Sequence, residues 1–266
     1  MTGSGTQQSP YVPTTWAELK TAAETYNAYI SLAAGTQWDM NDQYPEDTPG
    51  IELICAEIDF NDAVIKNLRK SSGILFKMNA GEHDVTMKNV NFSSAYITNA
   101  LVFSAIGYTD SHTLKLRSFG FGGELYDSGF WICDARGVET NGCAINLFLS
   151  NSSFLDPVKS LTNTTITLDG TVSTGVGTLI LKSSALYGSI KAIGGQYDLS
   201  FAGELCVCDI VLQNFATVGY VGDASTAVLN ISKIGDAQVT GNPCIQATSS
   251  QTHDAAWLNE HGFPCK

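Results

Sequence analysis

Short segments that alternate apolar and polar residues recur along most of this chain, and they constrain its fold more than any other feature. Alternation with a period of two places the apolar side chains on one face of an extended strand. Gly, Asn, Asp and Ser separate the segments, and residues such as Asn89 and Asn91 tolerate the left-handed backbone of tight corners. Most of the segments begin roughly 20 to 30 residues apart, the spacing of coils in a solenoid, so the pattern predicts an all-β solenoid. The strongest segments begin at Ile51, Asp84, Thr113, Ala144, Thr165, Thr178, Tyr197 and Ala227.

The composition indicates one large apolar core under a weakly charged surface. The chain has 266 residues, of which 44% are hydrophobic, enough for a single sizeable domain. Only 15% of the residues are charged, so Ser, Thr, Asn, Gln and Gly must build the surface, as in virion proteins and carbohydrate-facing proteins. A net charge of −12 argues against nucleic acid and anionic membranes as partners. No apolar run approaches the ~20 residues of a membrane span.

The first 28 residues predict a tail followed by a helix. Residues 1–13 are small and polar, without the basic and apolar parts of a secretory signal, and we expect a flexible tail there. Thr15 and Glu18 form a capping box at the start of a capping helix expected over residues 14–28. This helix would cover the open end of the first coil. Its apolar side would consist of Trp16, Leu19, Ala23 and Tyr26.

The β-helix is expected to extend over residues 29–250 without an internal domain boundary. Residues 35–50 mix aromatic, proline and polar residues, which predicts a loop that leaves the body of the solenoid. Within that loop, Trp38 and Tyr44 would be available to contact a partner.

The C-terminal residues 251–266 predict a second capping segment with a short helix. Thr252 or Asp254 could cap the start of that helix. Nitrogen and sulfur side chains near this end could in principle hold zinc, but their spacing lacks any Cys-x-x-Cys or His-x3-His knuckle, so we expect no metal and no cofactor. These side chains are Cys244, His253, His261 and Cys265.

The chain has seven cysteines, an odd number scattered along its length, which is not a disulfide framework. Cys206 and Cys208 lie two residues apart in an apolar run and would share the inward face of a strand. This usage favours synthesis in a reducing cytoplasm, as for a virion protein assembled inside a cell.

Three parts of the sequence together resemble the pectate-lyase-like right-handed parallel β-helix superfamily. They are the helix that begins Thr15-Trp-Ala-Glu-Leu, the coil Tyr29-Ile-Ser-Leu and the strand Val85-Thr-Met-Lys-Asn-Val-Asn-Phe. The resemblance covers residues 15 to about 250 and implies a single right-handed parallel β-helix. The superfamily includes polysaccharide lyases, glycoside hydrolases, phage tailspikes and other virion proteins, and its spikes are often trimers, so a homotrimer is one implied assembly. A fold of this kind does not imply a function.

Paired carboxylates are the candidates for catalysis, because glycosidases use two acids on either side of the scissile bond. If the chain is an enzyme, the acids to test are Glu124, Asp127 and Asp134. Tyr126, Phe130 and Trp131 lie close to Glu124 and Asp127 in the sequence; the alternative is that these two acids are turn residues. No Asp-x-Asp or Asp-Asp pair lies near Arg136, where a lyase would need its calcium site, and acid-rich polygalacturonase motifs are missing. We therefore expect no catalytic residue. Further acids considered are Asp198, Glu204 and Asp209.

Three functions follow, in order of preference. The first is a non-enzymatic structural or receptor-binding protein of a phage virion, such as a tailspike, fibre or capsid-surface protein. Its expected partners are other virion proteins, bound through the N-terminal tail, and a cell-surface polysaccharide, with no nucleic acid and no membrane. The second function is a polysaccharide lyase or glycoside hydrolase on the same fold. The third is a bacterial surface adhesin, extracellular or at the cell surface.

Overall fold

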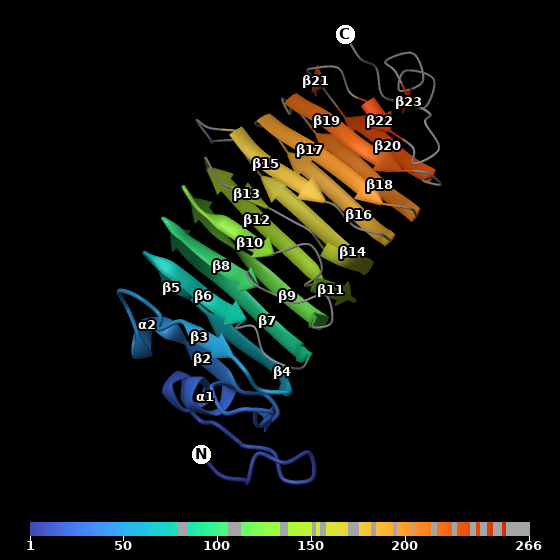
Figure 1. Ribbon diagram of the computed structural model, residues 1–266. Helices are drawn as coiled ribbons and strands as arrows, with labels where there is room; N and C mark the ends of the chain where they lie inside the picture. The colour runs from blue at the N-terminus through green and yellow to red at the C-terminus, as the bar shows by residue number, and fades with distance from the viewer. Residues whose placement is uncertain are drawn as a thin grey trace.

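The chain winds into a parallel β-solenoid with a helix at its N-terminal end (Figure 1). The computed structural model describes the backbone of residues 1–78, 84–105, 113–133 and 138–150 and of the strands beyond them. It describes the side chains of residues 1–78, 84–104, 113–130 and 141–147. In these parts the strands form two sheets, and the chain passes repeatedly from one sheet to the other. The predicted all-β solenoid is confirmed, whereas its right-handed winding stays a prediction.

The first sheet follows the strand order β1-β4-β7-β9-β11-β14-β16-β18-β20, with three further strands beside this path. Its strands are β1 (Tyr29–Ser31), β2 (Gln37–Asp39), β4 (Glu57–Lys66), β5 (Arg69–Lys70), β7 (Val85–Thr98), β9 (Leu114–Tyr126), β11 (Val138–Asn141), β12 (Ala144–Ser150), β14 (Val158–Asp169), β16 (Ala185–Ile193), β18 (Leu205–Gln213) and β20 (Val228–Ile234).

The second sheet follows the order β3-β6-β8-β10-β13-β15-β17-β19-β22-β23, and β21 pairs beside β19. Its strands are β3 (Ile51–Leu53), β6 (Gly73–Met78), β8 (Ala100–Ala105), β10 (Gly129–Cys133), β13 (Ser153–Phe154), β15 (Val176–Leu181), β17 (Gln196–Gly203), β19 (Thr217–Ala224), β21 (Gln238–Val239), β22 (Cys244–Gln246) and β23 (Thr252–His253). The helices are α1 (Trp16–Ala23) and α2 (Met40–Gln43), and neither described helix is long and apolar enough to cross a membrane.

Neighbouring coils stack in parallel register, as the sequence spacing predicts. Ile58 of β4 pairs with Met87 of β7, and Met87 pairs with Leu116 of β9. Further along the chain the coils become shorter, since Ile190 of β16 pairs with Ile210 of β18. Each coil thus supplies one rung of a common core, because a single coil cannot bury its own apolar face.

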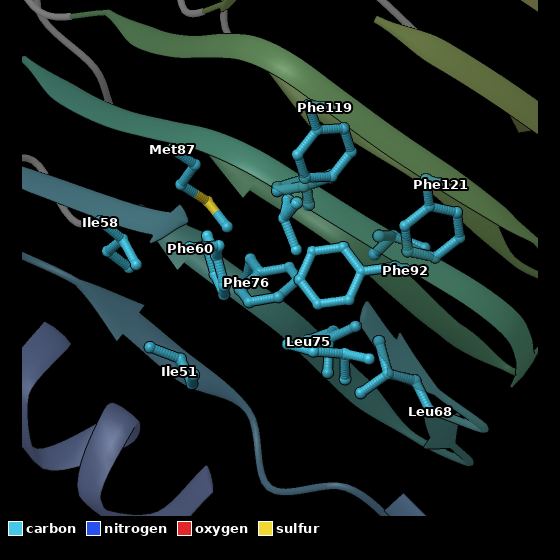
Figure 2. Close-up of a cluster of buried hydrophobic side chains, with 14 of the residues drawn as sticks. Ile51, Ile58, Phe60, Leu68, Leu75, Phe76, Met87, Phe92, Phe119 and Phe121 are labelled. Carbon is cyan, nitrogen blue, oxygen red and sulfur yellow. The ribbon is translucent and has the colours of Figure 1, made fainter. Parts of the chain in front are cut away.

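The core between the sheets is rich in phenylalanine (Figure 2). Phe92 of β7 is fully buried and its ring centroid lies 5.6 Å from those of Phe60, Phe76 and Phe119. Phe76 and Phe103 stack at 5.1 Å across the next pair of strands. Tilted and edge-on contacts of this kind add to the free energy gained from apolar burial. All phenylalanines with described side chains therefore lie inside the solenoid, and they are Phe60, Phe76, Phe92, Phe103, Phe119, Phe121 and Phe130.

The coils bend at residues in the left-handed backbone region, and these residues also stack from coil to coil. Asn89 has a φ of 57° and Ser118, at the equivalent place one coil later, has a φ of 47°. Gly142 follows with a φ of 67°, and an added Cβ there would lie 3.7 Å from the Ser118 nitrogen. The predicted corner at Asn89 is confirmed. Asn91 is different: it is an exposed strand residue that pairs with Val64 and Gly120.

Helix α1 closes the N-terminal end of the core, as predicted. Thr15 is its N-cap and accepts a 3.2 Å hydrogen bond from the Glu18 backbone nitrogen. The Glu18 carboxylate bonds to Thr14 and to the terminal amine of Met1, so it does not complete a reciprocal capping box. Tyr26 lies beyond the helix and is 61% exposed, so its predicted place on the buried side is wrong. The buried helix residues are Trp16, Leu19, Ala22 and Ala23.

The first 13 residues fold back onto the first coil, which differs from the flexible tail that the sequence predicts. Thr2 and Val12 form an antiparallel bridge, and Tyr11 pairs with Ile30 of β1. Ser31 donates to the Tyr11 carbonyl at 2.9 Å, so this segment covers part of the outer edge of the sheet. Covering an edge strand satisfies backbone groups that would otherwise be open to another chain.

The segment 35–50 is part of the body and not a loop that leaves it. Trp38 pairs with Ile65 within the first sheet and is only 8% exposed, so its predicted role in contacting a partner is wrong. Tyr44 is partly buried against the core. Asp47 anchors the segment through a 2.6 Å ion pair with the buried Lys70. Polar residues between the apolar ones concealed this packing in the sequence.

At the C-terminal end, Thr252 and His253 form β23, which runs antiparallel to β22. The predicted helix therefore does not start at Thr252, and the remainder of the predicted capping segment lies outside the described residues. Cys206 and Cys208 lie on β18, but their side chains are outside the described set.

Candidate functional site

The outer face of β5, β7 and β9 carries a continuous row of polar and aromatic side chains. We call this row the Tyr–Arg stripe and define it as Asn41, Arg69, Tyr96, Glu124 and Tyr126. The three strands lie side by side in the first sheet (Figure 1). Arg69 pairs with Tyr96, and Tyr96 pairs with Glu124, so the stripe crosses three coils in register.

Strand alternation directs the stripe outward. On β7, Ala95 and Ile97 are buried, whereas Tyr96 between them is 41% exposed. On β9, Leu125 is buried between Glu124 and Tyr126. Because alternate residues point to opposite faces of a strand, the buried neighbours hold these side chains toward solvent.

Arg69 is held in place at one end of the stripe. Its Nε donates a 3.2 Å hydrogen bond to Oδ1 of Asn41, and its guanidinium carbon lies 6.0 Å from the centre of the Tyr96 ring. Asp39 caps α2 by accepting from the Asn41 backbone nitrogen at 3.0 Å and also accepts from the Asn67 side chain at 2.8 Å. These contacts fix the position of Asn41 and so the orientation of the guanidinium. The bond from Asn67, followed by that from Asn41, lowers the pKa of Asp39.

Two tyrosines form the middle of the stripe. The ring centroids of Tyr96 and Tyr126 are 5.3 Å apart and the rings are tilted by 41°. The Tyr126 hydroxyl donates a 3.0 Å hydrogen bond to Oε2 of Glu124. Burial, followed by the bond to Glu124, raises the pKa of Tyr126, so its hydroxyl stays neutral and remains a donor.

The stripe presents apolar ring surface, hydrogen-bond donors and hydrogen-bond acceptors side by side on one face of the sheet. Exposed tyrosine rings offer apolar surface together with a polar edge, at a small cost in side-chain entropy. Glu124 offers carboxylate oxygens as acceptors for hydroxyl groups, and Arg69 offers donors. The rungs of a parallel sheet repeat at about 4.8 Å, so the row presents these groups at regular intervals along the solenoid.

The structure brings together only part of the predicted acid set. Glu124 is exposed on β9 and belongs to the stripe. Asp127 is a corner residue with a φ of 46°, at the place that Asn99 (φ 48°) occupies one coil earlier. Asn99 donates to the Tyr126 carbonyl at 3.0 Å, which ties these two corners together. Asp127 therefore matches the turn interpretation, and Asp134 lies outside the described residues.

Of the other acids and the nitrogen and sulfur side chains considered for metal, only some lie on described strands. Asp198 is on β17 in the second sheet, whereas Asp209 is on β18 in the first, and Glu204 lies outside the described residues. The register places His253 opposite Ile245 and not opposite Cys244, and His261 and Cys265 are outside the described residues. Among residues whose side chains are described, no cluster of His, Cys, Asp and Glu could hold a metal ion.

A second charged group lies on the outer face nearer the start of β4 and β7, and its contacts indicate a structural role. Lys88 forms ion pairs with Glu57 at 3.0 Å and Asp59 at 3.3 Å. Asp59 also accepts from the Asn61 backbone at 2.9 Å and the Asn89 side chain at 3.0 Å. Burial works to raise the pKa of Asp59, but these bonds and Lys88 outweigh it and lower the pKa. The group thus secures the left-handed corners at Asn61 and Asn89.

Comparisons with protein-family models, with curated proteins and with solved structures find no match. The parallel solenoid is established by the strand order and register of this chain itself.

Three residues of the stripe were missed by the sequence interpretation: Asn41, Arg69 and Tyr96. Tyr96 had a weak signal, because it lies between the apolar Ala95 and Ile97, but the left-handed residues Asn89 and Ser94 shift the alternation along residues 85–98. An ungapped alignment of that segment with residues 114–126 would place Tyr96 beside Leu125, because the register shifts between Phe92 and Ala95. Asn41 and Arg69 had no such signal, since their contact depends on the short helix α2, which the sequence predicted as part of a loop.

Proposed function

We propose that this chain is a non-enzymatic, glycan-binding structural protein of the kind that phage particles carry on their surface. The single observation that supports this most is the Tyr–Arg stripe, in which Tyr96 and Tyr126 pack together on the solvent side of a rigid sheet. Arg69 and Glu124 flank the tyrosines with donors and acceptors. Such a row suits a polysaccharide of the cell surface as the ligand.

The stripe supports binding over cleavage. Asp127 is used as a left-handed corner, and the Glu124 carboxylate accepts the Tyr126 hydroxyl. A glycosidase needs two carboxyl groups that face one bond in different protonation states. We therefore assign Glu124 to holding hydroxyl groups of the ligand.

Other features support the virion setting of this proposal. Cys55 and Cys143, the cysteines with described side chains, are buried thiols. Burial raises the pKa of Cys55 to about 12, which keeps its thiol protonated and unreactive. Such cysteines fit assembly in a reducing cytoplasm. The same proposal has three further parts. The chain is of a type within the pectate-lyase-like superfamily, it assembles as a homotrimer, and it attaches to other virion proteins through its N-terminal residues.

The test is affinity electrophoresis in gels cast with dextran, gellan, alginate, hyaluronan or a bacterial O-antigen. At least one polysaccharide should retard the unmodified protein, and Tyr96→Ala and Tyr126→Ala should each weaken that binding about tenfold, as for aromatic anchors of an interface. The matched control is Tyr26→Ala, which removes another exposed tyrosine outside the stripe and should leave retardation unchanged.

The same polysaccharides should show no new reducing ends after prolonged incubation with the protein. Cleavage that Glu124→Gln or Asp127→Asn abolishes would overturn the non-enzymatic assignment and favour the lyase or hydrolase alternative. A lack of retardation by every polysaccharide, in a folded protein, would overturn the glycan-binding proposal itself.

A further inference from the structure

The charge at one end of the Tyr–Arg stripe narrows the class of glycan. Arg69 is exposed, and its Nε is already bound to Asn41. The ion pairs among described residues give carboxylate partners to Lys20, Lys70, Lys88 and Lys115, whereas Arg69 has no carboxylate within ion-pair distance there. The contrast with Lys70, the next residue in the chain, is direct, because Lys70 is buried and paired with Asp47.

The guanidinium is oriented but not neutralised by these contacts. Asn41 is a neutral acceptor, and the Tyr96 ring attracts the cation through its face without supplying a negative charge. The two terminal nitrogens of an arginine held through Nε form a fork that matches the two oxygens of a carboxylate. The contacts within the protein already orient the guanidinium, so binding a ligand costs little additional side-chain entropy.

We propose that Arg69 is a carboxylate subsite of the Tyr–Arg stripe, so that the ligand is a glycan carrying uronic-acid-type sugars. The carboxylate of one sugar binds the Arg69 fork while that sugar or its neighbour contacts the Tyr96 ring. This inference rests on the proposed glycan-binding function. Because the chain as a whole carries a net charge of −12, an anionic glycan has to be recognised by a local cation of this kind.

The experiment compares each acidic polysaccharide with its carboxyl-reduced form. Gellan, alginate and hyaluronan are treated with carbodiimide and borohydride, which turns the carboxylates into primary alcohols and keeps the sugar backbone. The unmodified protein should bind at least one native polysaccharide about tenfold more tightly than its reduced form, the size expected for one charge-assisted bidentate contact. Arg69→Gln should bring that ratio close to one, with Arg69→Lys in between.

Two controls separate a subsite from a general effect of charge or folding. Lys77→Gln removes one exposed positive charge from β6 in the other sheet and should leave the ratio unchanged. Tyr126→Ala should weaken binding of native and reduced forms alike and so preserve the ratio. Circular dichroism and the unfolding temperature of Arg69→Gln should match those of the unmodified protein, because the side chain is exposed.

The outcomes distinguish this inference from the function on which it rests. If polysaccharides bind but native and reduced forms bind equally, and Arg69→Gln changes nothing, the carboxylate subsite is overturned while glycan binding stands. If Lys77→Gln lowers the ratio as much as Arg69→Gln does, general electrostatics replaces the subsite. If nothing in the panel binds, including neutral dextran and the O-antigen, the proposed function itself is overturned.

Discussion

Phe92 and Tyr96 lie four residues apart on β7, and each packs against aromatic rings of neighbouring coils. Phe92 does so inside the core and Tyr96 on the outer face of the sheet. Phe92 points inward, is fully buried and contacts the rings of Phe60, Phe119 and Phe121. Tyr96 points outward and is 41% exposed, and its ring packs against Tyr126. Phe92 and Phe121 occupy paired positions of neighbouring coils, whereas Tyr96 reaches Tyr126 diagonally, because Tyr96 pairs with Glu124 and Tyr126 pairs with Thr98.

We call the buried rings around Phe92 the inner row, and Tyr96 with Tyr126 the outer row. The two rows differ in what surrounds them. The inner row is enclosed by the two sheets, so its contacts contribute to the stability of the fold (Figure 2). The outer row leaves ring edges and polar groups open to solvent, which costs stability little and leaves a surface for a ligand. A solenoid can therefore change its outer row without changing its core, and the predictions below test that separation.

The largest expected effect is on the inner row. Phe92→Ala should lower the free energy of unfolding by about 3–5 kcal/mol, because it removes a buried ring and leaves a cavity. Chemical denaturation followed by circular dichroism measures the loss. Phe92→Leu is the matched control and should cost much less, since it keeps most of the apolar volume. Equal losses for both variants would contradict the role given to ring packing.

The corner at Asn89 should come next in size. Asn89→Ala should cost about 1–3 kcal/mol, since alanine disfavours the left-handed backbone and cannot bond to Asp59. Asn89→Gly keeps the backbone freedom and loses only the side-chain bond, so it should cost less than Asn89→Ala. Denaturation of the two variants side by side separates the terms. A larger loss with glycine would show that the left-handed conformation is not what constrains this position.

The hydrogen bonds and the ion pair of Asp59 predict a pH dependence of stability. Its pKa is lowered in the folded state, so its contribution to stability is complete above the unfolded pKa of about 3.9 and is lost as the pH falls through the folded value. Asp59→Asn should be less stable than the unmodified protein by about 1 kcal/mol at pH 5 and above, and this difference should shrink as the pH falls below about 3.9. Denaturation midpoints measured from pH 2 to pH 7 test this. A difference that does not change with pH would contradict the assignment to charge.

The smallest effect on stability is expected for the outer row. Tyr96→Ala should change the free energy of unfolding by less than about 1 kcal/mol, because half-exposed side chains bury little area. Thermal unfolding of Tyr96→Ala beside Phe92→Ala makes the comparison within one strand. A loss at Tyr96 as large as that at Phe92 would show that the outer row also supports the fold.

The sequence predicts the solenoid well because its signal is repeated in every coil. Alternation within the short runs of β7 and β9 indicates which residues face inward, although left-handed residues such as Asn89 and Ser94 shift it along β7. The corner at Asn89 was also predictable, since asparagine tolerates a left-handed backbone. The prediction of a left-handed corner at Asn91 was wrong. Its position between the buried Val90 and Phe92 makes it a strand residue, although asparagine tolerates a left-handed backbone.

The site was predicted only in part, because it depends on contacts between coils. Glu124 was named beside Tyr126 from sequence alone, but as a catalytic candidate. Tyr96 reaches that pair only through the register of β7 with β9, and Arg69 is fixed through Asn41 on a short helix. The prediction that Trp38 contacts a partner was wrong for a related reason. Its burial follows from the pairing of β2 with β4, which the residues around Trp38 do not indicate.

The most direct test of the account is the double variant Tyr96→Ala/Tyr126→Ala, measured for both polysaccharide affinity and unfolding temperature in the same preparation, with Tyr26→Ala alongside. The account predicts that the double variant loses at least about tenfold in affinity while its unfolding temperature stays close to that of the unmodified protein. Unchanged affinity in a folded double variant would contradict the central claim that this outer row binds the ligand.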